Sequence, residues 1–167
     1  MLTTRSSLMA ADDIWTGPKS TELVTVKVKG CIHIDTLRES VMSKAVNCLK
    51  PEGQLKYPEL RQYPDKWYGF LFWVWEENFC VENHVKINNG LQSESDLRDE
   101  LLAKPFEFGK SPWELIVLKN RVQTDETTLF FRIHHSLADG HSIMSIVYSL
   151  CEPVDELDKL SVSAFLN

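Results

Sequence analysis

The stretch FFRIHHSLADGHS, residues 130–142, brings together several side chains that could carry out proton chemistry. Two adjacent histidines, His134 and His135, end an apolar run, and Asp139 and Gly140 follow a few residues later. A neutral imidazole, with a pKa of about 6.5, can take a proton from an alcohol or thiol at neutral pH, so it can serve as a general base. The spacing is also compatible with two packed or exposed histidines at the end of a strand.

A strand predicted over residues 128–135 determines where the two histidines point. Alternation places Leu129, Phe131, Ile133 and His135 on one face and Phe130, Arg132 and His134 on the other. Only one histidine can therefore reach a given cavity from regular strand geometry. Asp139 is expected either to cap the following helix or to turn inward and form an ion pair. Gly140 suits an unusual backbone conformation or a close approach.

A metal-dependent hydrolase is an alternative for the same residues, because His134, His135, Asp139 and His141 lie within eight residues. Adjacent histidines on a strand face apart, however, and no H-x-x-x-H helical pair is present, so the spacing does not favour a metal. The four cysteines, Cys31, Cys48, Cys80 and Cys151, contain no C-x-x-C pair. That pattern excludes a zinc ribbon or a redox motif at the level of sequence. We therefore expect no bound metal.

The bulk composition indicates one ordinary globular domain rather than a disordered chain. The sequence has 167 residues, of which 43% are hydrophobic and 25% charged. The net charge is −6 and no basic stripe is visible, so nucleic-acid binding is not expected. The most apolar run, FLFWVW at residues 70–75, is far shorter than the roughly 20 residues that span a bilayer. A peripheral membrane contact stays open.

Hydrophobic periodicity predicts the elements around the motif, in the order strand, helix, strands, helix, strand, strand, helix. The predicted strands are 24–34, 67–75 (covered on both sides), 112–118 and 128–135. One helix is predicted to begin after Asp35 as its N-cap, and two more are predicted at 93–102 and 141–150. Residues 58–65 are expected to be irregular. This order predicts an α/β fold (α+β, two layers) in which a mixed, largely antiparallel sheet packs against helices. Residues 155–167 form a polar tail that we expect to be poorly ordered.

Other prominent side chains have simpler expected roles. Trp67, Trp73 and Trp75 are expected mainly to pack in the core. Trp113 is expected to anchor packing, with Glu114 as a local hydrogen-bond or ion-pair partner. The remaining histidines, His33 and His84, are expected at the surface or its boundary.

The heptapeptide HHSLADG resembles the H-H-x-x-x-D-G motif of acyltransferases that have the chloramphenicol-acetyltransferase-like fold. Its surroundings are most similar to the wax ester synthase/diacylglycerol acyltransferase family. SPWELIVLKN resembles that family's Pro-Leu-Trp-Glu strand, and ELRQYP, WEENFCVENHVK and SLMAADDIW resemble segments further upstream. The resemblance covers roughly residues 7 to 150.

The resemblance implies an acyl-CoA-dependent O-acyltransferase that makes wax ester or triacylglycerol from a long-chain alcohol or diacylglycerol. His135 would be the general base that deprotonates the hydroxyl, and His134 would support it. Asp139 would hold the loop through an ion pair with an arginine that the sequence does not identify, and Gly140 would leave room for substrate. Acyl-CoA would be a co-substrate, with no other cofactor. The substrate-binding residues are not identified.

The chain departs from the family pattern in two respects. The Pro-Leu-Trp-Glu strand is one residue tighter here, at Pro112, Trp113 and Glu114, which we expect to alter a turn rather than the chemistry. Family members have two similar halves with a substrate tunnel between them, and only the first half is matched, so the domain at 1–154 is expected to be incomplete. An open half-tunnel excludes water poorly, and water hydrolyses thioesters. The alternative is therefore a truncated, non-catalytic fragment.

Such a fragment would bind a lipid or a partner without turnover. In either case an apolar face is expected to meet a second half, another chain or a membrane. The resemblance also implies an intracellular location, peripheral at the endoplasmic reticulum, the plasma membrane or a lipid droplet.

Overall fold

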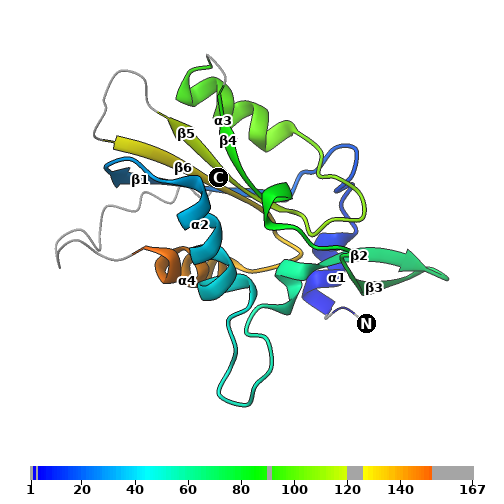
Figure 1. The fold of residues 1–167 in the computed structure, drawn as a ribbon. Coiled ribbons are helices and arrows are strands. Elements are labelled where there is room, and N and C mark those ends of the chain that lie inside the picture. Colours follow the sequence, from blue (N-terminus) through cyan, green and yellow to red (C-terminus); the bar gives the residue numbers. More distant parts are fainter. Residues whose placement is uncertain (1, 3, 90–91, 120–125, 152–167) are drawn as a thin grey trace.

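A four-stranded sheet forms the centre of the molecule (Figure 1). The computed structural model describes residues 2, 4–89, 92–119 and 126–151. The strands are ordered β1 (Thr21–Lys29), β6 (Glu126–His134), β5 (Trp113–Lys119) and β4 (Val85–Asn88). β6 pairs antiparallel with both β1 and β5, while β4 runs parallel to β5. The predicted mixed, largely antiparallel sheet is therefore confirmed.

Helices cover both faces of this sheet. On one face, α2 (Ile34–Val41), its π-helical continuation η1 (Met42–Val46) and α4 (Gly140–Leu150) pack on the main core. On the other face, α3 (Glu94–Ala103) buries Leu97 and Leu101 against Ile116 and Phe130. The short helix α1 (Thr4–Ala10) belongs to the N-terminal segment, the part of the chain before β1. The elements η2 (Pro58–Arg61) and η3 (Val81–Asn83) are single 3-10 turns.

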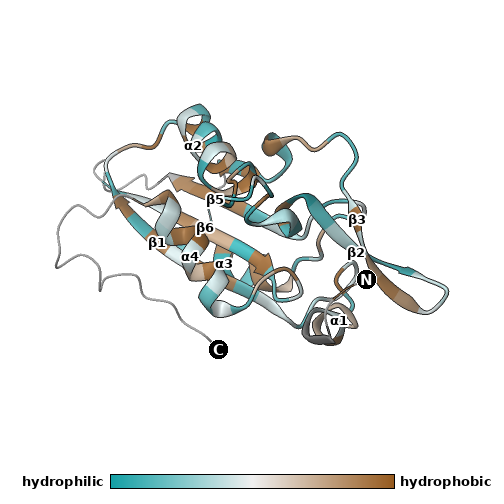
Figure 2. Ribbon diagram, turned by 90° about the horizontal axis from the view of Figure 1, so that it is seen from below, coloured by the Kyte–Doolittle hydropathy of each residue, from teal (hydrophilic) through white to brown (hydrophobic). Residues whose placement is uncertain are grey.

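The strand β6 is buried along its length because both of its faces are covered. Every residue from Thr127 to His134 is buried. A strand that packs on both faces carries apolar side chains at consecutive positions, as in LFFRI. The neighbouring strand β5 is coloured mainly as hydrophobic in Figure 2 for the same reason. The histidines thus end the most enclosed strand of the sheet.

The first predicted strand and helix have different bounds in the structure. β1 begins three residues before the predicted start and ends at Lys29, because Gly30, with φ of +90°, turns the chain out of the sheet. The prediction that Asp35 caps the next helix is wrong. His33 occupies the cap position, and Asp35 lies in the first turn, where it contacts Arg38 at 3.3 Å. A first-turn carboxylate still favours the positive end of the helix dipole.

Residues 58–75 agree with the sequence prediction only in part, because a strand is present at Phe70–Trp75 but is not covered on both sides, and 58–65 is not irregular. They form η2 and a separate two-stranded hairpin of β2 (Gln62–Trp67) and β3 (Phe70–Trp75). Tyr68 and Gly69 connect the strands with φ of +49° and +85°, the pattern of a tight hairpin turn. The hairpin projects from the body in Figure 1, so its outer part has little to pack against.

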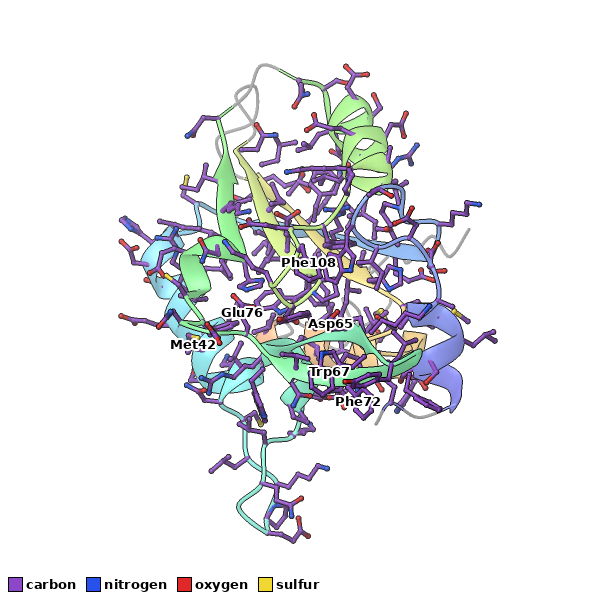
Figure 3. All side chains as sticks on the ribbon, turned by 90° about the vertical axis from the view of Figure 1, so that its right-hand side faces the viewer. Met42, Asp65, Trp67, Phe72, Glu76 and Phe108 are labelled. Atoms are coloured by element: carbon purple, nitrogen blue, oxygen red, sulfur yellow. The ribbon has the colours of Figure 1, made fainter. Side chains whose placement is uncertain are left out.

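The three tryptophans of this hairpin differ in how far they are buried. Trp73 packs partly buried beside Leu71 and the N-terminal segment, as expected for a core residue. Trp67 is 68% exposed and Trp75 52% exposed, so the core-packing prediction is wrong for both. Figure 3 looks onto the hairpin and labels Trp67 and Phe72 on it. An isolated pair of strands has too few neighbours to enclose large rings.

The later helices match the sequence closely. Ser93 caps α3 by accepting a hydrogen bond from the backbone N–H of Asp96 at 3.1 Å, and Asp139 caps α4 in the same way. The predicted polar tail at 155–167 lies outside the described residues. None of the described helices combines the length and apolar character needed to cross a membrane.

Candidate active site

His135 lies one residue beyond β6, half-buried, with one ring nitrogen already engaged. Its backbone N–H donates to the carbonyl of Ser20 at 2.9 Å, and Nδ1 lies 2.8 Å from the carbonyl oxygen of Ala138. A carbonyl can only accept, so Nδ1 carries the hydrogen of the neutral ring and Nε2 keeps its lone pair. This tautomer is the one a general base requires.

His134 is completely buried and has partners on both ring nitrogens. The backbone N–H of Ser136 donates to Nδ1 at 3.3 Å, and the Ser136 hydroxyl lies 3.0 Å from the same atom. Nε2 therefore carries the hydrogen and donates to the carboxylate of Asp12 at 3.3 Å. Burial lowers the pKa of His134, and the Asp12 carboxylate opposes this only in part. The ring is thus a neutral link between β6 and the N-terminal segment.

Asp12 is a member of this cluster that the sequence did not identify. Its Oδ2 accepts from the backbone N–H groups of Lys19 and Ser20 at 2.6 and 2.7 Å, as well as from His134. Burial alone would raise the pKa of Asp12, but these donors outweigh it and hold the pKa at about 2. Since Ser20 in turn accepts from the backbone of His135, Asp12 is connected to both histidines. Its one signal in the sequence was the likeness of SLMAADDIW to the family's opening segment.

Asp139 and Gly140 lie where the loop enters α4. Asp139 Oδ1 accepts from the backbone N–H of Ser142 at 2.9 Å, so its capping role is confirmed. Its ion pair with an arginine stays a prediction. The arginine of the histidine strand, Arg132, is fully buried and pairs with Glu114 at 2.9 Å. No atom would lie within 4 Å of a Cβ added at Gly140, so open space adjoins this residue.

A cavity of about 220 Å³ adjoins the same loop. Lys56, Tyr57, Glu59 and Leu60 form one side, and Leu137, Ala138 and the first turns of α4 form the other. Ligand pockets usually enclose about 300 Å³ or more, so this space is the size of a partial site. The ring of His135 does not line it. The cavity adjoins the backbone that orients the histidine rather than the reactive nitrogen itself.

Trp113 and Glu114 have the roles expected of them. The indole of Trp113 is 2% exposed and donates from Nε1 to the carbonyl of Leu60 at 2.9 Å, which ties β5 to η2. Glu114 contacts both Lys86 and Arg132. Burial alone would raise the pKa of Glu114, but Lys86, Lys104 and Arg132 together lower it below its ordinary value.

His33 and His84 were both expected at the surface or its boundary, but they differ in burial. His33 is exposed, as expected. The prediction for His84 is wrong, because its side chain is 2% exposed and pairs with the equally buried Glu76. Within the described part of the chain, no group of three His, Cys, Asp or Glu side chains could hold a metal ion.

Solved structures with the same arrangement define the fold class. A wax ester synthase/diacylglycerol acyltransferase from Marinobacter aquaeolei VT8 aligns with a TM-score of 0.57 at 15% identity, over 86% of this chain and 36% of that one. The SgcC5 protein from Streptomyces globisporus aligns with a TM-score of 0.64 at 15% identity, over 89% and 34%. The starter condensation domain of rhizomide synthetase RzmA gives 0.63 at 12% identity, over 90% and 35%. The chain therefore has the chloramphenicol-acetyltransferase-like fold that condensation domains share.

Curated sequences that are similar to this chain include several wax ester synthase/diacylglycerol acyltransferases. Wax ester synthase/diacylglycerol acyltransferase 4 from Arabidopsis thaliana is 32% identical over 96 residues, which covers 53% of this chain and 18% of that protein. Its relative numbered 5 from the same plant is 31% identical over 106 residues, covering 57% and 20%. No protein-family model matches the chain. The predicted resemblance to the wax ester synthase/diacylglycerol acyltransferase family is confirmed, and the match spans about a fifth of the length of these relatives.

Proposed function

We propose that this chain is the histidine-bearing part of an acyl-CoA-dependent O-acyltransferase, with His135 as its general base. The observation that carries the proposal is the Nδ1 hydrogen bond of His135 to Ala138, which leaves Nε2 as an acceptor on a half-buried ring. Homology to acyltransferases supplies the reaction class. The acceptor would be a long-chain alcohol or diacylglycerol, and acyl-CoA would supply the fatty acyl group.

In the proposed reaction the acceptor hydroxyl donates its hydrogen bond to Nε2 of His135. As the hydroxyl oxygen attacks the thioester carbonyl carbon, its proton passes to Nε2 and the ring becomes an imidazolium. The carbon–sulfur bond of the tetrahedral intermediate then breaks, and the departing sulfur takes the proton back. The products are the ester and the free thiol of CoA. The carbonyl of Ala138 favours the imidazolium because it accepts from Nδ1 throughout.

His134, Asp139 and Gly140 support this base rather than contact the reacting atoms. His134 would fix the end of β6 through Asp12, and Asp139 would fix the start of α4. Gly140 would leave the open space beside the loop for substrate. Residues from a second half of the fold, or from another chain, would complete the tunnel and exclude water. A peripheral position at a membrane or lipid droplet would suit such substrates.

A non-catalytic lipid- or partner-binding role is the second candidate. It is favoured by the exposed aromatic side chains at the hairpin tip, where Trp67 and Phe70 are each more than 60% exposed and Tyr68 is 90% exposed. Large exposed apolar groups that lie together commonly mark an interaction surface. This role would leave His135 without a catalytic task.

The decisive experiment compares His135→Ala with His33→Ala, a matched change at an exposed histidine. Ester formation from palmitoyl-CoA and hexadecanol, or from palmitoyl-CoA and diacylglycerol, would be measured together with thiol release. Loss of a general base should lower the rate by about 10²–10⁴-fold, while the His33 variant keeps the wild-type rate. Full activity in His135→Ala would reject the assignment of the base. Binding of palmitoyl-CoA without any product would support the second candidate.

A further inference from the structure

A buried pair of side chains, Glu76 and His84, has no part in the chemistry described so far. The ring of His84 is stacked between Phe79 and Trp113, with centroids 5.0 and 4.5 Å away and interplanar angles of 13° and 17°. Glu76 lies at the end of β3, where the hairpin joins the body (Figure 3). Both side chains are 2% exposed. Charged groups are seldom buried this completely unless a partner offsets the loss of water.

The hydrogen bonds around His84 require one more proton than a neutral ring and a carboxylate would hold. Nδ1 lies 2.9 Å from the carbonyl oxygen of Trp113, which can only accept. Nε2 lies 3.1 and 3.2 Å from the two carboxylate oxygens of Glu76. If Nδ1 donates to the carbonyl, Nε2 can bond to Glu76 only when one of the two side chains carries an extra proton. The pair therefore holds either an imidazolium with a carboxylate or a neutral ring with a carboxylic acid.

The same pair organises one wall of the cavity. The carboxylate of Glu76 also accepts from the backbone N–H of Ser111 at 2.8 Å, which fixes the start of β5. From there, three donors reach consecutive carbonyls of η2: the Ser111 hydroxyl bonds to Glu59, the Trp113 indole to Leu60, and the Glu76 backbone to Arg61, at 2.8, 2.9 and 2.8 Å. A short 3-10 turn leaves such carbonyls unsatisfied, so these bonds set its position. Glu59 and Leu60 line the cavity.

The segment from Ser111 to Trp113 is also hydrogen-bonded to β6, the strand that ends at His134. The carbonyl of Pro112, between Ser111 and Trp113, accepts from the backbone N–H of His134 at 2.9 Å. The carbonyl of His84 accepts from Leu115 at 2.7 Å. Glu76 and His84 are thus bonded to the start of β5, and the start of β5 is bonded both to η2, which lines the cavity, and to the end of β6.

We infer that Glu76 and His84 are positioning residues that share one proton and hold the η2 wall of the cavity in place beside the catalytic loop. The effect on turnover rests on the proposed function, whereas the shared proton does not. Among the described charged groups near the pair, Arg61 lies over the ring of Phe79, with its guanidinium carbon 5.5 Å from that ring centroid. Glu82 of η3 is exposed, and Lys86 and Glu114 pair with each other.

The substitution Glu76→Gln distinguishes the effect of the shared proton from the effect of the hydrogen bonds to His84 and Ser111. A glutamine at this position can still accept from Ser111 and can donate to a neutral His84, so it keeps the bonds without the extra proton. Glu76→Ala removes the bonds as well. Glu77→Gln is the matched control, because Glu77 is the exposed neighbour of Glu76. Loss of bonds to a buried charged group should raise hydrogen exchange at the Ser111 amide about tenfold in Glu76→Ala, with little change in the other two variants.

Nitrogen-15 spectra of the histidine rings test the shared proton without any need for catalysis. At neutral pH we expect the wild type to show either a His84 ring with hydrogen on both nitrogens or a neutral ring beside a protonated Glu76 carboxyl, which the carbon-13 signal of that carboxyl reports. In Glu76→Gln, we expect His84 to show a neutral ring with its hydrogen on Nδ1 at neutral pH. A neutral His84 ring beside a charged Glu76 carboxylate in the wild type would overturn the inference.

Kinetics test the positioning role. Glu76→Ala should raise KM for the acyl acceptor about tenfold with a smaller change in kcat, and Glu76→Gln should restore KM and alter its pH dependence. Equal KM values and pH profiles in Glu76→Ala and Glu77→Gln would overturn the positioning role. If the wild type gives no product, the proposed function fails, and the ring spectra and amide exchange still decide whether the pair holds the wall.

Discussion

Replacing Asp12 by asparagine tests the buried cluster behind the two histidines. The carboxylate accepts hydrogen bonds from three backbone N–H groups and from His134, and these donors favour its charged form. An asparagine has one acceptor oxygen and no charge, so it cannot satisfy the same donors equally well. We therefore expect Asp12→Asn to destabilise the fold and to loosen the end of β6.

The magnitude follows from the pKa of Asp12. A decrease from the ordinary value of 3.8 to about 2 corresponds to about 2.5 kcal/mol at neutral pH, at about 1.4 kcal/mol per pKa unit. Partial contact with solvent weakens such interactions, so 1–2 kcal/mol is a fair expectation for the charge alone, on the order given by linkage. Because the folded-state pKa is depressed, this stability is fully present above about pH 4 and is lost as the pH falls towards 2.

Urea unfolding at pH 7, 5, 3 and 2 measures this difference directly. Asp13→Asn is the control, since Asp13 is the adjacent exposed carboxylate. We expect Asp12→Asn to unfold at lower urea than the control at pH 7 and the gap to narrow steadily below pH 4. A gap that stays constant from pH 7 to pH 2, or equal losses in both variants, would show that the carboxylate charge does not stabilise the cluster.

Two further predictions concern the strands that hold the site. Trp113→Phe removes the hydrogen bond to Leu60 and should cost about 1 kcal/mol in urea unfolding, whereas the same change at exposed Trp67 should cost nothing measurable; equal losses would contradict this. Arg132→Met leaves Glu114 without its buried partner and should cost about 3 kcal/mol, most of which a second change, Glu114→Leu, should restore. A neutral Arg132→Met would mean that the pair adds no stability.

The sequence predicted best where periodicity and capping act locally. Asp139 was identifiable as a candidate cap because the hydrogen bond of a cap reaches only three residues ahead. Hydrophobic periodicity also predicted the strands at 112–118 and 128–135, which are present as β5 and β6. These signals depend on short stretches of chain, so no tertiary information was needed.

The errors arose where distant segments decide the outcome. FLFWVW is as apolar as a buried strand, but its place in a projecting two-stranded hairpin leaves Trp75 exposed. His84 looked like a surface residue because its partner, Glu76, is equally polar and only the fold shows that both are buried. Asp12 meets His134 across nearly the whole described chain, and no local pattern records that contact.

The strand order has a consequence for how this chain is made. β1 leaves the ribosome early, yet the one described strand to which it is hydrogen-bonded is β6, whose last residue, His134, pairs with Thr21. Contacts between such distant positions form slowly, and until they form β1 presents an open edge to other chains. The histidine-bearing strand is also the piece that closes the sheet. Translation that halts before it would yield an aggregation-prone intermediate rather than a partly active protein.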